Sequence, residues 1–166
     1  APDGGLLMVT RIPQGISRLA PDGTLVQLVD FEALDAAITG GVSTARGVPH
    51  GAVAVGPTGQ IWFGAFGDQG TSARVMALAP DGRPAEPAPA PVAWRGGNVA
   101  GLVVQADGTA WALVALDDSD FGGLYKLAPG GSWAEVRRDL RLSKYGDLAL
   151  DAAGQLYLSE DEAGRV

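Results

Sequence analysis

The chain has a single histidine, His50, in the stretch VPHGAVAVGPTGQIWFGAFGD that covers residues 48–68. An imidazole titrates close to neutral pH, so it can serve as a general base or as a metal ligand. His50 is therefore the candidate catalytic residue of this sequence. The alternative is a histidine that only hydrogen-bonds to backbone groups at the start of a strand.

Acidic side chains gather in three short polar segments, AFGDQGTS, ALDDSDFG and SEDEAG. Carboxylate oxygens are the ligands that hard cations such as Ca²⁺ and Mg²⁺ prefer. One of these two cations is the candidate cofactor, and its candidate ligands are Asp117, Asp118, Asp120 and Glu160. The alternative is that these acids are simply solvated, and DDSD lacks the glycine and the distant glutamate of an EF-hand loop.

Composition narrows the remaining chemistry. The chain has 166 residues, no cysteine and a net charge of −7, so it has no disulfides or thiolate sites, and nucleic acid or an anionic membrane is not an expected partner. No apolar run is long enough to span a membrane. The sequence also lacks a G-x-S-x-G nucleophile motif and a glycine-rich phosphate loop that opens a helix.

Two kinds of glycine turn alternate along the chain and define a repeat. The first kind joins two apolar strands, as in GAVAVGPTGQIWFG, GLVVQADGTAWAL and GDLALDAAGQLYLS, and PDGGLLMV resembles the end of the same unit. The second kind follows a strand with a basic residue, as in GISRLAPDGTLVQLV, SARVMALAPDGRPAE and GLYKLAPGGSWAEV. Turn glycines of the first kind, Gly4, Gly59, Gly108 and Gly154, are 46 to 55 residues apart, a spacing typical of four-stranded propeller blades.

The alternation of apolar residues around these turns predicts antiparallel strands, and the fold class is all-β: a β-propeller of four-stranded blades, with about three and a half blades in this chain. The expected blades of this single domain are residues 1–47 (partial), 48–96, 97–143 and 144–166 (partial). The expected strands are 6–10, 15–20 and 24–29, then 51–55, 61–65, 73–79 and 88–94, then 100–105, 110–115, 122–128 and 132–138, and finally 146–150 and 155–159. One helix is predicted from Asp30 to Gly41.

These elements place the chemistry-bearing residues on one rim. The first strand of each blade lines the central channel of a propeller, and its start shares a rim with the loop between the second and third strands. The starting positions, nine residues before the turn glycines, are His50, Val99 and Tyr145, and Asn98 and Lys144 are their neighbours. Asn98, Tyr145 and Asp68 are therefore the candidate ligand-binding residues.

A fixed position three residues after the turn glycine is bulky in every copy. It is occupied by Leu7, Trp62, Trp111 and Tyr157. We expect these side chains to pack between neighbouring blades and not to form a stacking platform for a ligand.

Three and a half blades do not close a ring, because a propeller leaves no blade with an unpaired flank. Three arrangements are open. The chain is one piece of a longer chain with six or seven blades, half of a homodimer that closes a ring, or an open arc. In such a dimer, the two strands of the last partial blade of one copy would join the three strands of the first partial blade of the other. The combined blade would then have five strands, one too many.

The motifs resemble known propeller families over nearly the whole chain. VPHGAVAVGPTGQIWF resembles the repeat of streptogramin (virginiamycin B) lyase, YGDLALDAAGQLYLSEDEAGRV is similar to gluconolactonase and NHL repeats, and GISRLAPDGTLVQLVDFEALDAAI looks like the ScyD/ScyE type of exported bacterial propeller. The resemblance implies a six- or seven-bladed propeller, which we expect to be secreted or periplasmic in a bacterium.

The resemblance also implies a divalent cation at the channel mouth. In the lyase family Mg²⁺ lies with histidine and glutamate, and His50 matches its Pro-His-Gly element, but Gly64 stands where its repeat often carries glutamate. In gluconolactonases carboxylate and asparagine hold the cation, and here Asn98 and one rim acid are the candidates.

Two functions follow as hypotheses. The first is a propeller that binds a small molecule or a protein partner at the rim of its central channel, together with a divalent cation. The alternative is a metal-dependent lactonase of the gluconolactonase type, or a lyase, whose site is completed by a further half or a second subunit. The absence of an assembled catalytic set around His50 favours the binding function.

Overall fold

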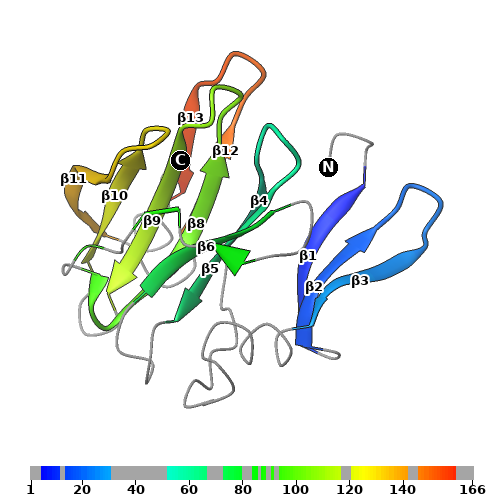
Figure 1. Ribbon diagram of the computed structural model, residues 1–166. Coiled ribbons are helices and arrows are strands. Elements are labelled where there is room, and N and C mark those ends of the chain that lie inside the picture. The colour runs from blue at the N-terminus through cyan, green and yellow to red at the C-terminus, as the bar shows by residue number, and fades with distance from the viewer. Residues whose placement is uncertain are drawn as a thin grey trace.

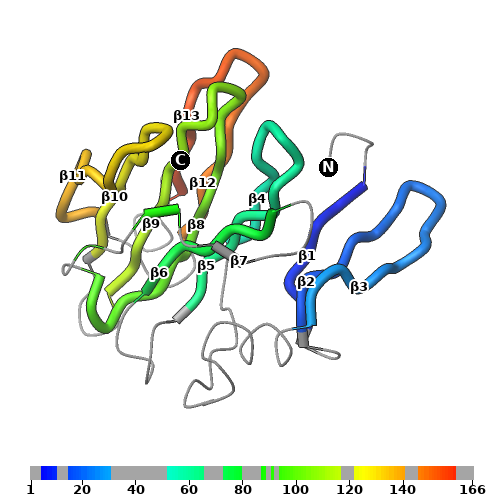
Figure 2. Tube along the Cα trace, viewed as in Figure 1, coloured from blue at the N-terminus to red at the C-terminus, as the bar shows by residue number. Residues whose placement is uncertain are grey.

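The computed structural model describes residues 5–11, 14–30, 52–66, 73–79, 84–85, 87–88, 91, 94–116, 121–141 and 146–159. These residues form four antiparallel sheets, each built from strands that are consecutive in the sequence. Figures 1 and 2 show the first three sheets following one another from blue to yellow, with the fourth, in orange and red, beside the third.

The first sheet holds β1 (Leu6–Arg11), β2 (Gln14–Leu19) and β3 (Leu25–Asp30), and the second holds β4 (Val53–Val55), β5 (Ile61–Phe66), β6 (Ala73–Leu78) and β7 (Pro84–Ala85). The third sheet holds β8 (Gly97–Val104), β9 (Ala110–Leu116), β10 (Phe121–Leu127) and β11 (Trp133–Arg141). The fourth holds β12 (Asp147–Leu150) and β13 (Leu156–Ser159).

The predicted strands are confirmed with small shifts, except in one place. The outer strand of the second sheet was expected at 88–94, but the strand that pairs with β6 is β7, at Pro84–Ala85. Trp94 is instead fully buried in a core. Asp30, the predicted helix cap, is the last residue of β3, and the rest of the predicted helix lies outside the described residues.

The turns form as their residue types predict. Gly59 and Gly108 have φ angles of 84° and 85°, in the left-handed region that a tight hairpin needs and that glycine adopts without steric cost. In the turn before β9, the Thr109 N–H donates to Asp107 Oδ1 at 2.9 Å, and Thr24 does the same with Asp22 before β3. These local bonds stabilise the turns and so help to set the register of the two strands that each turn joins.

The hydrophobic cores lie between consecutive sheets. Ile16 of the first sheet packs with Phe63 and Met76 of the second, which leaves Phe63 only 1% exposed. Trp94 packs with residues of both the second and the third sheet, and Leu113 of the third packs with Leu148 of the fourth. Face-to-face packing of this kind is how the blades of a propeller bury their surfaces.

In the first three sheets, the bulky residue three positions after the turn glycine faces the next sheet along the chain. Leu7 packs against the core between the first and second sheets, Trp62 against the next core and Trp111 against the one after it. Tyr157, the fourth copy, is 42% exposed on the free face of the last sheet. The expected packing between neighbouring sheets is therefore present for three of the four residues.

Among the described residues, no helix is long and apolar enough to cross a membrane.

Candidate functional site

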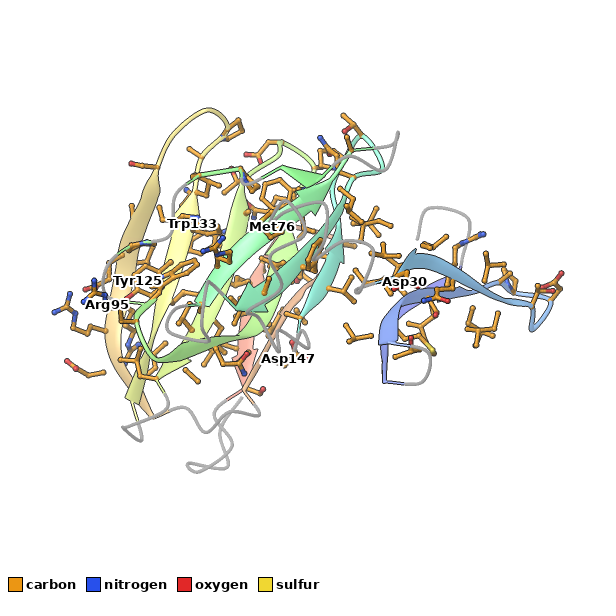
Figure 3. The ribbon with its side chains drawn as sticks, turned by 60° about the horizontal axis from the view of Figure 1, so that its bottom comes forward. Asp30, Met76, Arg95, Tyr125, Trp133 and Asp147 are labelled. Carbon is orange, nitrogen blue, oxygen red and sulfur yellow. The ribbon has the colours of Figure 1, made fainter. Side chains whose placement is uncertain are left out.

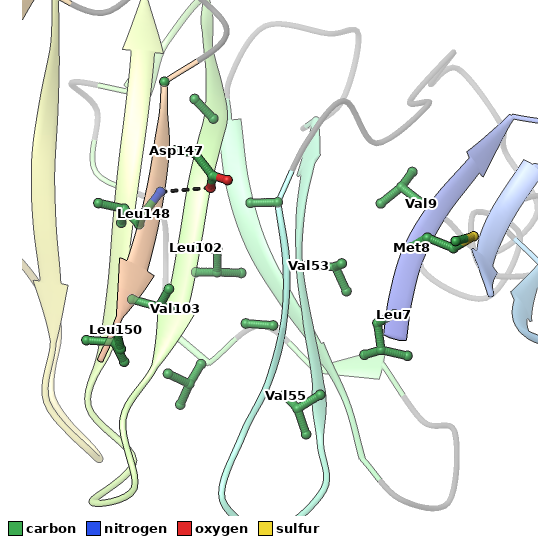
Figure 4. A pocket seen from close by; sticks show the side chains of 15 residues that line it. Leu7, Met8, Val9, Val53, Val55, Leu102, Val103, Asp147, Leu148 and Leu150 are labelled. Carbon is green, nitrogen blue, oxygen red and sulfur yellow. Dashed lines mark hydrogen bonds between the residues drawn. The ribbon is translucent and has the colours of Figure 1, made fainter. Parts of the chain in front are cut away.

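One groove of about 640 Å³ lies where β4, β8 and β12, the first strands of their sheets, meet β1, whose position after a turn glycine corresponds to a second strand. We call it the inner groove, and Figure 4 shows its lining. It is lined by Leu7, Met8, Val9, Ala52, Val53, Ala54, Val55, Ala100, Leu102, Val103, Val104, Gly146, Asp147, Leu148 and Leu150. Its volume is in the range of small-molecule sites, about 300–1,000 Å³.

Backbone polar groups also face this groove. Within the described part, β1, β4, β8 and β12 each stand at the edge of a sheet and pair on one side only. Half of the N–H and C=O groups of an edge strand have no partner in its own sheet. The inner groove therefore combines aliphatic side chains with rows of backbone donors and acceptors.

Asp147 carries the only ionisable side chain in the groove lining given above. Its backbone N–H donates to Ser159 Oγ at 2.9 Å, and the Leu148 N–H donates to its Oδ1 at 2.7 Å. The first bond fixes the backbone at the start of β12, and the second, drawn as a dashed line in Figure 4, holds the carboxylate.

Sequence reasoning missed Asp147. A usable signal was present, because the strand DLAL opens with an acid and is otherwise apolar. In the two preceding sheets the corresponding positions, seven residues before the turn glycine, hold Ala52 and Gly101.

Of the predicted site residues, the structure describes only Asn98. It is the second residue of β8, pairs with Ala115 near the end of β9 and is half-buried, and it is not part of the groove lining. It lies opposite the last residues of β9, and its predicted role at the rim stays a prediction. The other predicted residues lie outside the described part: His50, Asp68, Asp117, Asp118, Asp120, Tyr145 and Glu160.

The metal site stays a prediction for the same reason. In the described part of the chain, no three histidine, cysteine, aspartate or glutamate side chains come together to hold a metal ion. Asp147 and Asn98 are the oxygen-bearing side chains that this part contributes at the starts of β8 and β12.

A smaller hollow of about 370 Å³ lies between the turns that follow β8 and β12. Here Gln105 Nε2 donates to the Gly154 carbonyl at 3.2 Å and so links the third sheet to the fourth. Asp151 Oδ1 accepts the N–H groups of Ala153 and Gln155 at 2.9 and 2.8 Å. These polar groups hold the two turns together.

An aromatic cluster lies in the core between the second and third sheets, and its residues are not part of the groove lining. The Trp94 ring packs edge-on against Tyr125 at 5.2 Å and lies 5.1 Å from the Trp133 ring. Figure 3 shows Tyr125 and Trp133 close together and Asp147 well apart from them. Burial, and then the nearby charge of Glu135, raises the pKa of Tyr125.

Stacked antiparallel sheets whose edge strands meet around a groove define the class: the fold is that of a partial β-propeller. It resembles the structure of a gluconolactonase from Xanthomonas campestris, with a TM-score of 0.56 and 19% identity over 89% of this chain and 42% of that one. It also resembles a structure described as a presumed gluconolactonase, with a TM-score of 0.50 and 20% identity over 89% of this chain and 42% of that one. The chain thus spans less than half the length of either structure.

These likenesses show the fold, and no family model or curated protein sequence matches the chain. The predicted gluconolactonase-like propeller fold is confirmed at this level. The similarity to streptogramin lyase and to the ScyD/ScyE type stays a prediction.

Proposed function

We propose that this chain is part of a β-propeller that binds a small molecule in the inner groove and at its rim. The observation that carries the proposal is the groove itself, which is built by all four sheets and has the volume of a ligand site. Asp147 supplies a fixed acceptor at one end, and Asn98 and the predicted residues Tyr145 and Asp68 would contribute at the rim. A protein partner at the rim is the other form of this binding function.

A second candidate function is metal-dependent lactone hydrolysis. It is favoured by the likeness to a gluconolactonase structure over 89% of this chain. Ca²⁺ or Mg²⁺, held by Asp117, Asp118, Asp120 and Glu160, would polarise the lactone carbonyl. His50 would then serve as the general base for the attacking water.

One set of measurements separates the two functions. The purified chain is analysed for bound metal, and a panel of lactones and esters is tested for binding and for turnover. Binding without turnover supports the first function. Bound metal together with turnover that His50→Ala abolishes supports the second. The control is Asp22→Asn, because Asp22 is exposed and belongs to neither the groove lining nor the predicted site residues. A chain that holds no metal and turns over none of these molecules contradicts the second function.

We also propose how the ring is completed and where the protein acts. The ring is completed either by a second copy of this chain or by the rest of a longer chain, and the mature protein acts outside the bacterial cytoplasm. A native mass of one or of two chains distinguishes the arrangements of this 16.9 kDa unit.

A further inference from the structure

We infer that the inner groove takes an extended peptide segment of a partner polypeptide, which adds a strand to the inner edge of β1, the edge that does not pair with β2. The inference rests on the proposed binding function, since it names the kind of ligand that the same groove takes. It uses a strand position that is occupied in the other three sheets.

The repeat gives β1 the position of a second strand. Leu7 stands three residues after its turn glycine, as Trp62 does in β5 and Trp111 in β9. Those strands pair on their inner edges with the first strands β4 and β8, and β13 pairs in the same way with β12. Within the described residues, β1 pairs only with β2. Its inner edge is therefore the one second-strand edge in this part of the chain that has no partner strand.

Leu7 and Val9 direct their backbone groups toward this inner edge. Neighbouring residues of a strand direct their N–H and C=O groups to opposite edges. In the second sheet, the Gly64 N–H donates to the Ala52 carbonyl at 3.0 Å, on the side of the first strand. Val9 has the position of Gly64, five residues after the turn glycine. The N–H and C=O groups of Val9, and of Leu7 two residues before it, therefore face the groove.

The lining of the groove follows the edges of strands. It includes the consecutive residues 7–9 on β1, 52–55 along β4, 102–104 on β8 and 146–148 along β12. Successive side chains of a strand point to opposite faces of its sheet, so a groove that touches all of them runs along the edge, where the backbone is accessible. An extended peptide pairs with such an edge through its own N–H and C=O groups, which is the binding mode called strand addition.

The described first strands indicate which side chains fit this position. Each places alanine or valine opposite the bulky residue of its second strand, and the pairs are Ala54–Trp62, Val103–Trp111 and Ala149–Tyr157. Valine or leucine stands on both sides of this residue in all three strands. We therefore expect a segment with alanine or valine opposite Leu7 and a larger aliphatic residue before and after it. Figure 4 shows Leu7 and Val53 on opposite sides of the space between β1 and β4.

A partner polypeptide is a better source of this segment than a second copy of the described part. All three described first strands are already bonded to the second strands of their own sheets. A second copy would have to open one of these hairpins to supply a strand, and the bonds gained at β1 would only replace the bonds lost.

The first test is an NMR titration of the isotope-labelled chain with the peptide acetyl-AVAVGK-amide, which copies residues 52–56 and adds a lysine for solubility. We expect hydrogen exchange of the Leu7 and Val9 amides to slow at least about tenfold when the peptide is bound, because both N–H groups gain a partner. The amide of Leu25, on the outer edge of the same sheet, should keep its exchange rate.

Methylated peptides test the alternation of the bonds without changing the protein. A methyl group on the nitrogen that copies Ala54 should abolish binding, because this N–H faces the second strand in the arrangement of the second sheet. A methyl group on the nitrogen that copies Val55 should change the affinity by less than about threefold, because that N–H faces away. Equal binding of the two methylated peptides would overturn the inference.

Two proline variants test the edge on the protein. Val9→Pro removes an N–H that faces the groove and should weaken binding of the unmodified peptide at least about tenfold. Leu25→Pro is the matched control at the outer edge of the sheet, since Pro84 stands at the equivalent position of the second sheet, two residues after the turn glycine. It should leave the affinity unchanged. Circular dichroism checks that both variants fold.

The inference and the proposed function fail separately. If the unmodified peptide does not bind, the inference is wrong, and a lactone or ester that binds would still support the proposed function. A dimer of the chain that forms only when the peptide is absent would place a second copy at this edge and overturn the partner polypeptide.

Discussion

The carboxylates of Asp22 and Asp107 each accept the N–H of the threonine two residues later, at 2.9 Å. An ionised carboxylate is the stronger acceptor, and these bonds hold the pKa of both groups below the ordinary value. The same residues shape the hairpin turns, so we expect the stability of these turns to fall at acid pH. Because both side chains are fully exposed, the contribution is modest.

Asp107→Asn should flatten the acid side of the stability profile. A carboxyl whose pKa is lower in the folded state stabilises the fold above its unfolded pKa, and this contribution is lost as the pH falls through the lower folded pKa. For aspartate the loss begins near pH 4. Urea unfolding from pH 5 to pH 2.5 should show a shallower decline for the asparagine variant, and a parallel decline would contradict the proposed role of the bond.

At the scale of elements, two glycines permit the sheets to approach each other. A Cβ atom at Gly64 would lie 2.7 Å from Val99 Cβ in the third sheet, and one at Gly101 would lie 2.7 Å from the Leu148 nitrogen in the fourth. Both contacts are with atoms that side-chain rotation cannot move. The spacing of the sheets is therefore set partly by the absence of side chains at these positions.

Gly64→Ala should destabilise the fold by about 1–3 kcal/mol through overpacking between the second and third sheets. Gly131→Ala is the comparison, because its added Cβ would meet only Ala128 of the same exposed turn, with the carbonyl oxygen at 3.2 Å and Cβ at 3.8 Å. Chemical denaturation measures both. Equal losses for the two variants would show that close approach of the sheets is not what Gly64 provides.

The strands were predictable because their turns are local. An Asp-Gly or Pro-x-Gly corner between apolar runs fixes a hairpin without information from the rest of the chain. The outer strand of the second sheet was misplaced because its segment is rich in proline, which breaks the alternation on which such a prediction depends. Asp147 was missed because one acid at a strand start is an ordinary surface feature until the other strands that line the groove are known.

At the scale of the whole molecule, the two middle sheets are covered on both faces and the two end sheets on one. Leu6 and Leu25 are 58% and 55% exposed on the first sheet, and Tyr157 is 42% exposed on the last. These end faces are where a further blade would pack. The described residues alone thus leave apolar surface in water at both ends of the stack.

Phe63→Ala and Tyr157→Ala should therefore differ sharply in the isolated chain. Phe63 is buried between the first and second sheets, and its removal should cost about 3–5 kcal/mol. Tyr157 is exposed, and its loss should change the free energy of unfolding by about 0.5 kcal/mol or less. If Tyr157→Ala costs as much as Phe63→Ala, or splits a dimer into single chains, the last sheet is covered in solution.

Each sheet is made of strands that follow one another in sequence, and this has a consequence for how the molecule opens. Nearly all hydrogen bonds of a sheet join neighbouring segments, so one sheet can unravel while the others persist, as in other arrays of repeats. Amide hydrogen exchange should then fall into blocks, slowest in β8–β10 and fastest in β12 and β13. Uniform exchange rates over all four sheets would mean that they unfold as a single cooperative unit.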